Sequence, residues 1–145
     1  MLYLDTSVLV PLVLREATSG TIEQWFASAP ARQLVTSRWT LVEFASAIGN
    51  KVRAGALSQR LGAAALDTFE AQIVAAVRLA AFDDTDLTAA ARFVSRFELG
   101  LRAGDALHLA IAHRLRATRL VTLDQRMAVA ARALKIDAEE PGSPA

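Results

Sequence analysis

The chain of 145 residues is long enough to bury one hydrophobic core of ordinary size, and no linker or repeat marks a second domain. Its formal net charge is only +1, so binding to a nucleic acid would depend on a local basic patch. The absence of cysteine excludes disulfides, thiolate metal sites and cysteine nucleophiles.

Short apolar runs alternate along the chain with longer segments of helical periodicity. The pattern predicts strands at 1–5, 33–36, 79–82, 120–123 and near Ile136, and helices at 6–16, 21–29, 39–53, 58–77, 87–97, 105–116 and 125–134. This alternation predicts an α/β fold of three layers, in which a central, mostly parallel sheet of four to five strands is flanked by about seven helices. One domain should span residues 1–138, and residues 139–145 should form a short flexible tail.

The first residues show no basic segment followed by an apolar stretch and a cleavage site, so no secretory signal is visible. No apolar run approaches the roughly 20 residues that are needed to span a bilayer. The sequence therefore predicts a cytoplasmic protein without a membrane partner.

Two aspartates follow predicted strands. Asp5 comes directly after the apolar run 1–4, and Asp124 comes directly after 120–123. The carboxyl ends of parallel strands share one edge of a sheet, which is where ligands bind in open α/β folds. A simpler interpretation is that each aspartate caps the helix that follows it.

Two further acids lie in strongly apolar helical segments. Glu43 is surrounded by apolar residues in 41–45, and Asp105 opens the segment Gly-Asp-Ala-Leu-His-Leu-Ala at 104–110. Glu43 could instead reach back to Thr40 in a capping box or be exposed, and Asp105 could be a cap. However, so apolar a helix belongs inside the domain, where a carboxylate at its start is costly unless it is paired.

Four carboxylates that met in one crevice would repel one another, and a divalent cation would remove that repulsion. Oxygen ligands without a cluster of Cys or His favour Mg²⁺, or Mn²⁺, over Zn²⁺. Mg²⁺ held by a few carboxylates keeps several waters and commonly binds phosphates. The pattern therefore points to metal-assisted hydrolysis of phosphodiester bonds.

The sequence resembles the PIN-domain nucleases, and it looks most like the VapC-type toxins of bacterial toxin–antitoxin pairs. The resemblance covers residues 1–136 and is carried by Asp-Thr-Ser at 5–7, the glutamate in an apolar helix, the segment 104–110 and Leu-Val-Thr-Leu-Asp at 120–124. Its most specific part is the segment that contains Asp105.

The resemblance implies a Mg²⁺-dependent endoribonuclease that forms a homodimer and is inhibited by a cognate antitoxin. It also implies an acidic catalytic site with two polar neighbours, formed by Asp5, Glu43, Asp105 and Asp124 together with Ser7 and Thr122. Many family members carry a further acid shortly after the fourth, whereas this chain has Gln-Arg-Met at 125–127. A single cation is therefore expected.

In the mechanism that we infer from this resemblance, Asp5 and Asp105 contact the cation directly. Glu43 and Asp124 act through water or orient the attacking water. Attack by a metal-activated water would leave a 5′-phosphate and a 3′-hydroxyl, without a role for the RNA 2′-hydroxyl. Arginines beside the acidic segments could hold the RNA backbone, although a solvated surface position is the simpler interpretation of each: Arg38, Arg102 and Arg126.

Other functions fit the sequence less well. A phosphatase of the haloacid-dehalogenase type needs a second aspartate two residues after the first, where this chain has Ser7, and a phospho-receiver domain needs an acidic pair at the first strand. The alternative of a non-enzymatic α/β domain that binds a partner, with the acids acting as caps, stays open.

Two further features have structural interpretations. His108 could be a packing residue or a partner of Asp105, and the acids at 83–86 could cap a helix through Asp84 or Thr85.

Overall fold

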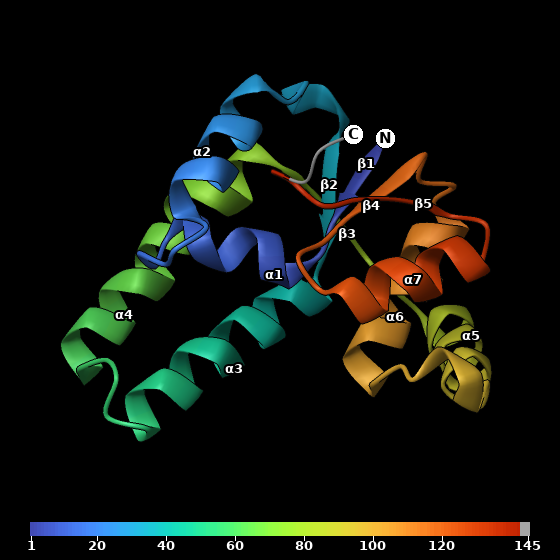
Figure 1. The fold of residues 1–145 in the computed structure, drawn as a ribbon. Coiled ribbons are helices and arrows are strands. Elements are labelled where there is room, and N and C mark those ends of the chain that lie inside the picture. The colour runs from blue at the N-terminus through green and yellow to red at the C-terminus, as the bar shows by residue number, and fades with distance from the viewer. Residues whose placement is uncertain (143–145) are drawn as a thin grey trace.

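A central sheet of five strands, all parallel, organises the computed structural model, which describes residues 1–142 (Figure 1). The strands lie side by side in the order β3-β2-β1-β4-β5. Their bounds are β1 (Leu2–Leu4), β2 (Leu34–Ser37), β3 (Arg78–Ala80), β4 (Arg119–Val121) and β5 (Asp137–Glu139). The predicted α/β fold with a parallel sheet is confirmed.

Seven α-helices connect these strands within residues 1–142: α1 (Thr6–Leu9), α2 (Ser19–Ser28), α3 (Trp39–Arg53), α4 (Gln59–Thr68), α5 (Asp84–Val94), α6 (Ala103–Arg114) and α7 (Gln125–Ala133). Short 3₁₀ turns add η1 (Val10–Leu12), η2 (Ala31–Gln33), η4 (Val74–Ala76) and η5 (Phe97–Leu99), and the π-helical turn η3 (Phe69–Ile73) extends α4. None of the helices in this part of the chain is long and apolar enough to cross a membrane.

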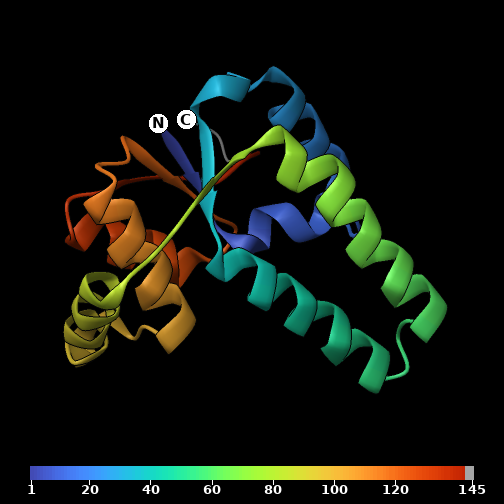
Figure 2. The same ribbon diagram turned by 180° about the vertical axis from the view of Figure 1, so that it is seen from behind.

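The helices form two layers because successive strand residues point to opposite faces of the sheet. Tyr3 packs with the residues of α5, α6 and α7, whereas its neighbour Leu4 packs with α1, α3 and the end of α4. The two views show α1–α4 on one side of the sheet and α5–α7 on the other (Figures 1 and 2). Both faces are thus covered, which explains why the central strand β1 consists only of Leu, Tyr and Leu.

Several helix ends differ from the prediction for local reasons. The first helix was expected to run to residue 16, but α1 ends at Leu9 and Pro11 lies in a separate 3₁₀ turn, because proline cannot donate the helical hydrogen bond. Helix α5 begins at Asp84, three residues before the prediction, because Asp83 and Asp86 form a capping box. The predicted capping residue, Asp84 or Thr85, was wrong.

Ordered structure extends into the segment that was predicted as a tail. Glu139 is the last residue of β5, where it accepts hydrogen bonds from Trp25 Nε1 at 2.5 Å and from Arg119 Nη1 at 2.9 Å. Pro141 is buried. The boundary at residue 138 therefore falls inside the last strand, and residues 143–145 of the predicted tail lie outside the described residues.

Candidate metal-binding active site

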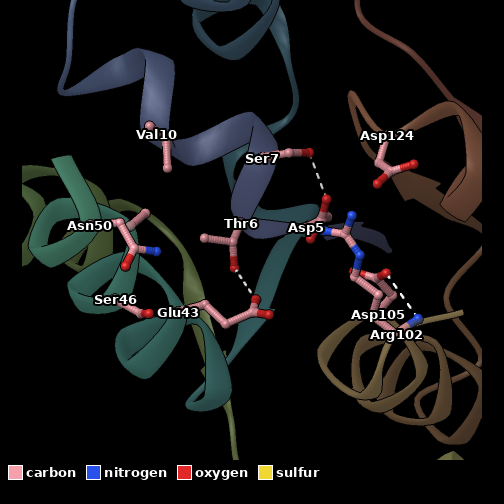
Figure 3. A pocket seen from close by; sticks show the side chains of 11 residues that line it. Asp5, Thr6, Ser7, Val10, Glu43, Ser46, Asn50, Arg102, Asp105 and Asp124 are labelled. Carbon is pink, nitrogen blue, oxygen red and sulfur yellow. Dashed lines mark hydrogen bonds between the residues drawn. The ribbon is translucent and has the colours of Figure 1, made fainter. Parts of the chain in front are cut away.

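A cleft of about 520 Å³ opens at the carboxyl edge of the sheet (Figure 3). All four acids predicted from the sequence line it. They come from the end of β1, from α3, from the first turn of α6 and from the loop after β4: Asp5, Glu43, Asp105 and Asp124. The parallel sheet brings together carboxylates that are up to 119 residues apart in the sequence because β1 lies between β2 and β4.

Asp5 follows the last residue of β1, and two hydroxyl groups hold its carboxylate. Its Oδ2 accepts hydrogen bonds from Ser7 Oγ at 2.6 Å and from Thr122 Oγ1 at 2.8 Å, and the residue is only 6% exposed. Both hydroxyl residues are those that the resemblance implied as polar neighbours. Asp5 occupies the N-cap position of α1, but its side chain bonds these hydroxyl groups and not the helix backbone, so capping does not explain the carboxylate.

Glu43 is held across the cleft by residues of two other helices. Its Oε2 accepts hydrogen bonds from Thr6 Oγ1 at 2.6 Å and from His108 Nε2 at 2.5 Å. Burial alone would raise the pKa of Glu43, but the hydrogen bond and charge of His108, together with the bond from Thr6, outweigh it and lower the pKa. Glu43 is therefore anionic at neutral pH, and its contacts replace the capping box to Thr40.

Asp105 occupies the first turn of α6, where its Oδ2 accepts a hydrogen bond from the backbone N–H of Arg102 at 3.3 Å. The helix begins at Ala103, two residues before the prediction, so Asp105 lies inside it. Burial raises the pKa of Asp105; the Arg102 N–H opposes this, and the charges of Asp5, Asp124 and Glu43 raise it further. Mutual repulsion of the acids is thus a property of this cleft.

Asp124 caps α7 and also lines the cleft. Its Oδ1 accepts hydrogen bonds from the backbone N–H groups of Arg126 at 2.8 Å and Met127 at 3.2 Å. The simpler interpretation of this residue as a cap is therefore correct. It does not remove Asp124 from the site, because the side chain lies at the cleft opposite Ser7 (Figure 3).

His108 was predicted to be either a packing residue or a partner of Asp105, and the second alternative is wrong. The ring is fully buried and lies 2.5 Å from Glu43 Oε2 and 3.7 Å from Asp5 Oδ1. The carboxylate of Asp105 instead turns back toward the start of α6, while His108 points across to α1 and α3. Spacing on one helix could not reveal a partner on another.

The donor set of the cleft fits a hard divalent cation. One ligand atom each of Asp5, Glu43 and His108 lies within 4.8 Å of the others. His108 Nε2 is already bonded to Glu43, so the carboxylate oxygens are the ligands available to an ion. The predicted direct ligand Asp105 lies outside this tight group but shares the cleft. Burial is the main cause of its raised pKa, and the charges of the other three acids add to it; a cation would oppose both effects.

The predicted arginines are placed differently from one another. Arg102 lines the cleft, whereas Arg38 and Arg126 are exposed and lie outside the lining residues of the described chain. Sequence reasoning missed the polar wall formed by Ser46 and Asn50. Their helical spacing of three and seven residues from Glu43 was a usable signal.

Comparison with known proteins identifies the family. The family model described as PIN domain matches residues 2–133. The chain belongs to the PIN-domain family. This PIN domain is also 32% identical over 146 residues to Ribonuclease VapC35 of Mycobacterium tuberculosis (strain CDC 1551 / Oshkosh), a match that covers 98% of each chain. The resemblance inferred from the sequence is confirmed.

Solved structures share the fold of this PIN domain. The crystal structure of Mycobacterium tuberculosis VapC20, described as a sarcin-ricin loop cleaving toxin, aligns with a TM-score of 0.71 and 21% identity over 90% of this chain and 95% of that one. A toxin–antitoxin complex from Klebsiella pneumoniae aligns with a TM-score of 0.66 and 15% identity over 99% and 100%. At these identities the likeness is one of fold.

Proposed function

We propose that this PIN-domain protein is a Mg²⁺-dependent endoribonuclease and the toxin of a toxin–antitoxin pair. The observation that carries the proposal is the meeting of four carboxylates from four separate segments in one cleft. The 32% identity to a protein named as a VapC ribonuclease supports RNA as the substrate. Mn²⁺ could replace Mg²⁺, because both prefer oxygen ligands.

In the proposed site Asp5 and Asp105 would hold the cation, and Asp5 is kept in place by Ser7 and Thr122. When bound, the cation supplies Lewis-acid stabilisation of the phosphoryl oxygens and lowers the pKa of a water molecule. Glu43 and Asp124 accept hydrogen bonds from the attacking water and so orient it. Glu43 suits this task because its lowered pKa keeps it an acceptor at neutral pH.

Substrate binding in this proposal relies on Arg102, whose side chain lines the cleft together with Asp5 and Asp105 (Figure 3). An arginine can bind one phosphate through two hydrogen bonds. Attack of water on that phosphate, with the 3′-oxygen as the leaving group, would give a 5′-phosphate and a 3′-hydroxyl.

A cognate antitoxin and a homodimeric state also belong to the proposal. Both are implied by the resemblance to VapC-type toxins, and the antitoxin is supported by the shared fold of a chain in the Klebsiella pneumoniae toxin–antitoxin complex. The cytoplasmic location predicted from the sequence stays a prediction.

The proposal is tested by cleavage of RNA with Mg²⁺, using protein refolded from denaturant to remove any bound antitoxin. Asp5→Asn and Asp105→Asn should abolish cleavage, as should chelation of the metal. Asp67→Asn is the matched control, since Asp67 is exposed on α4 away from the cleft. Full activity in either cleft variant would refute the nuclease assignment.

A second measurement separates the nuclease from a non-enzymatic domain whose acids are only caps. A built cation site should raise the melting temperature when Mg²⁺ is added, because a ligand that binds only the folded state stabilises it. The gain should be smaller in Asp5→Asn and unchanged in Asp67→Asn. Equal melting temperatures with and without Mg²⁺ would favour the non-enzymatic domain.

A further inference from the structure

A buried chain of polar groups lies behind Glu43. The hydroxyl of Tyr3 bonds His108 Nδ1 at 2.9 Å, and His108 Nε2 bonds Glu43 Oε2 at 2.5 Å. Tyr3 and His108 are both 0% exposed, and their rings meet edge to face with centroids 5.7 Å apart. This series of hydrogen-bonded side chains runs from Tyr3 on β1 through His108 on α6 to Glu43 on α3, where it ends at the cleft.

Packing alone does not explain His108. Its neighbours on α6, Leu107 and Leu109, are apolar core residues, and an imidazole placed among them is costly unless its nitrogens find partners. Both nitrogens do find partners: Nδ1 bonds Tyr3 on β1, and Nε2 bonds Glu43 on α3 and lies 3.2 Å from Thr6 Oγ1 on α1. The ring therefore has one orientation in which it is fully hydrogen-bonded.

This orientation constrains the carboxylate of Glu43. Thr6 and His108 both bond Oε2, so that oxygen is engaged by the protein itself. The other oxygen, Oε1, lies against Gly104 in the first turn of α6, where a Cβ would overlap it. With one oxygen engaged and the other seated against a glycine, the carboxylate has little freedom to rotate.

We propose that Tyr3 and His108 are positioning residues for Glu43: the imidazole holds Oε2, the tyrosine hydroxyl holds the imidazole, and Oε1 is left for the contents of the cleft. Neither residue touches the substrate in this arrangement. The kinetic part of the inference rests on the proposed nuclease function, whereas the hydrogen-bond part can be tested without it.

The kinetic test compares Tyr3→Phe, His108→Leu and His108→Gln. The Gln amide can replace the Nε2 donor, so His108→Gln should retain most of the kcat. His108→Leu should lose about 10- to 100-fold in kcat with a small change in KM, as is usual when a supporting hydrogen bond to a functional residue is removed. Tyr3→Phe should lose roughly 2- to 10-fold, the effect of one hydrogen bond.

Ser19→Ala is the matched control, since Ser19 is 1% exposed and its hydroxyl donates to the Pro11 carbonyl at 2.7 Å, away from the cleft. It should lower stability without lowering kcat. A kcat in Tyr3→Phe equal to that of the wild type, or a His108→Gln variant no better than His108→Leu, would overturn the inference. The Tyr3 variant and the control decide it even if His108→Leu fails to fold.

The second test needs no activity. In ¹⁵N-histidine-labelled protein at neutral pH without metal, His108 Nε2 should carry a downfield proton that exchanges slowly. Exposed His113, the other histidine of the chain, provides the reference. The proton should move upfield in Glu43→Gln, because a charge-assisted bond becomes a neutral one.

The two tests distinguish the two ideas. An unprotonated Nε2, or a proton signal that is unchanged in Glu43→Gln, would overturn the positioning role whatever the activity. A wild-type protein that cuts no RNA but shows the expected signal would refute the nuclease proposal and leave the Tyr3–His108–Glu43 arrangement standing.

Discussion

Gly104→Ala is expected to lower activity through a single added methyl group. Gly104 is the second residue of α6, and a Cβ there would overlap Glu43 Oε1 and come within 3.4 Å of Trp39 Nε1. Glu43 would have to move, although Thr6 and His108 hold its other oxygen. The substitution thus has two opposing effects: alanine stabilises the helix relative to glycine, and the displacement of Glu43 destabilises the fold.

The balance can be worked out from the structure. Alanine inside a helix is favoured over glycine by up to about 1 kcal/mol. Loss of one of the two hydrogen bonds to the charged Oε2 costs about 1.5–3 kcal/mol. The free energy of unfolding should therefore fall by about 0.5–2 kcal/mol, and the rate of RNA cleavage should fall by about 10- to 100-fold.

Gly20→Ala is a close control for this substitution. Gly20 is likewise the second residue of a helix, α2, but a Cβ there meets no atom of the described chain within 4 Å. Urea unfolding should show a gain of up to about 1 kcal/mol for Gly20→Ala, with unchanged cleavage. If Gly104→Ala gained as much stability and kept full activity, the argument that glycine makes room for Glu43 would be refuted.

Three further predictions concern charge and backbone strain. The folded pKa of Asp105 is raised, so its charge opposes folding once the pH exceeds its unfolded pKa. Asp105→Asn without metal should therefore raise the melting temperature at pH 7, a gain that should vanish in acid. Arg102→Ala should weaken RNA binding, measured by filter-binding titration, and should lower the salt dependence of the binding constant by the equivalent of about one phosphate contact. Arg126→Ala should change neither the affinity nor its salt dependence. Arg116 and Lys135 have φ angles of 51° and 62°, so replacing either by glycine should stabilise the fold by about 0.5–1 kcal/mol in urea unfolding without affecting cleavage.

The sequence by itself determined the fold class and the four acids of the cleft. Alternating apolar runs and helical segments predict a parallel sheet, and strand ends in such a sheet share an edge; hence Asp5 and Asp124 could be placed together. Element ends were less accurate at α1 and α6. These depend on backbone hydrogen bonds that Pro11 interrupts and that Arg102 and Asp105 satisfy.

Only the tertiary structure decided how each acid is held. Asp5 and Asp124 are both strand-end aspartates, yet one binds hydroxyl groups and the other caps a helix. Glu43 depends on Thr6 and His108, which lie 37 and 65 residues away. Such contacts leave no periodic signal in one sequence, because they depend on the angles at which helices cross the sheet edge.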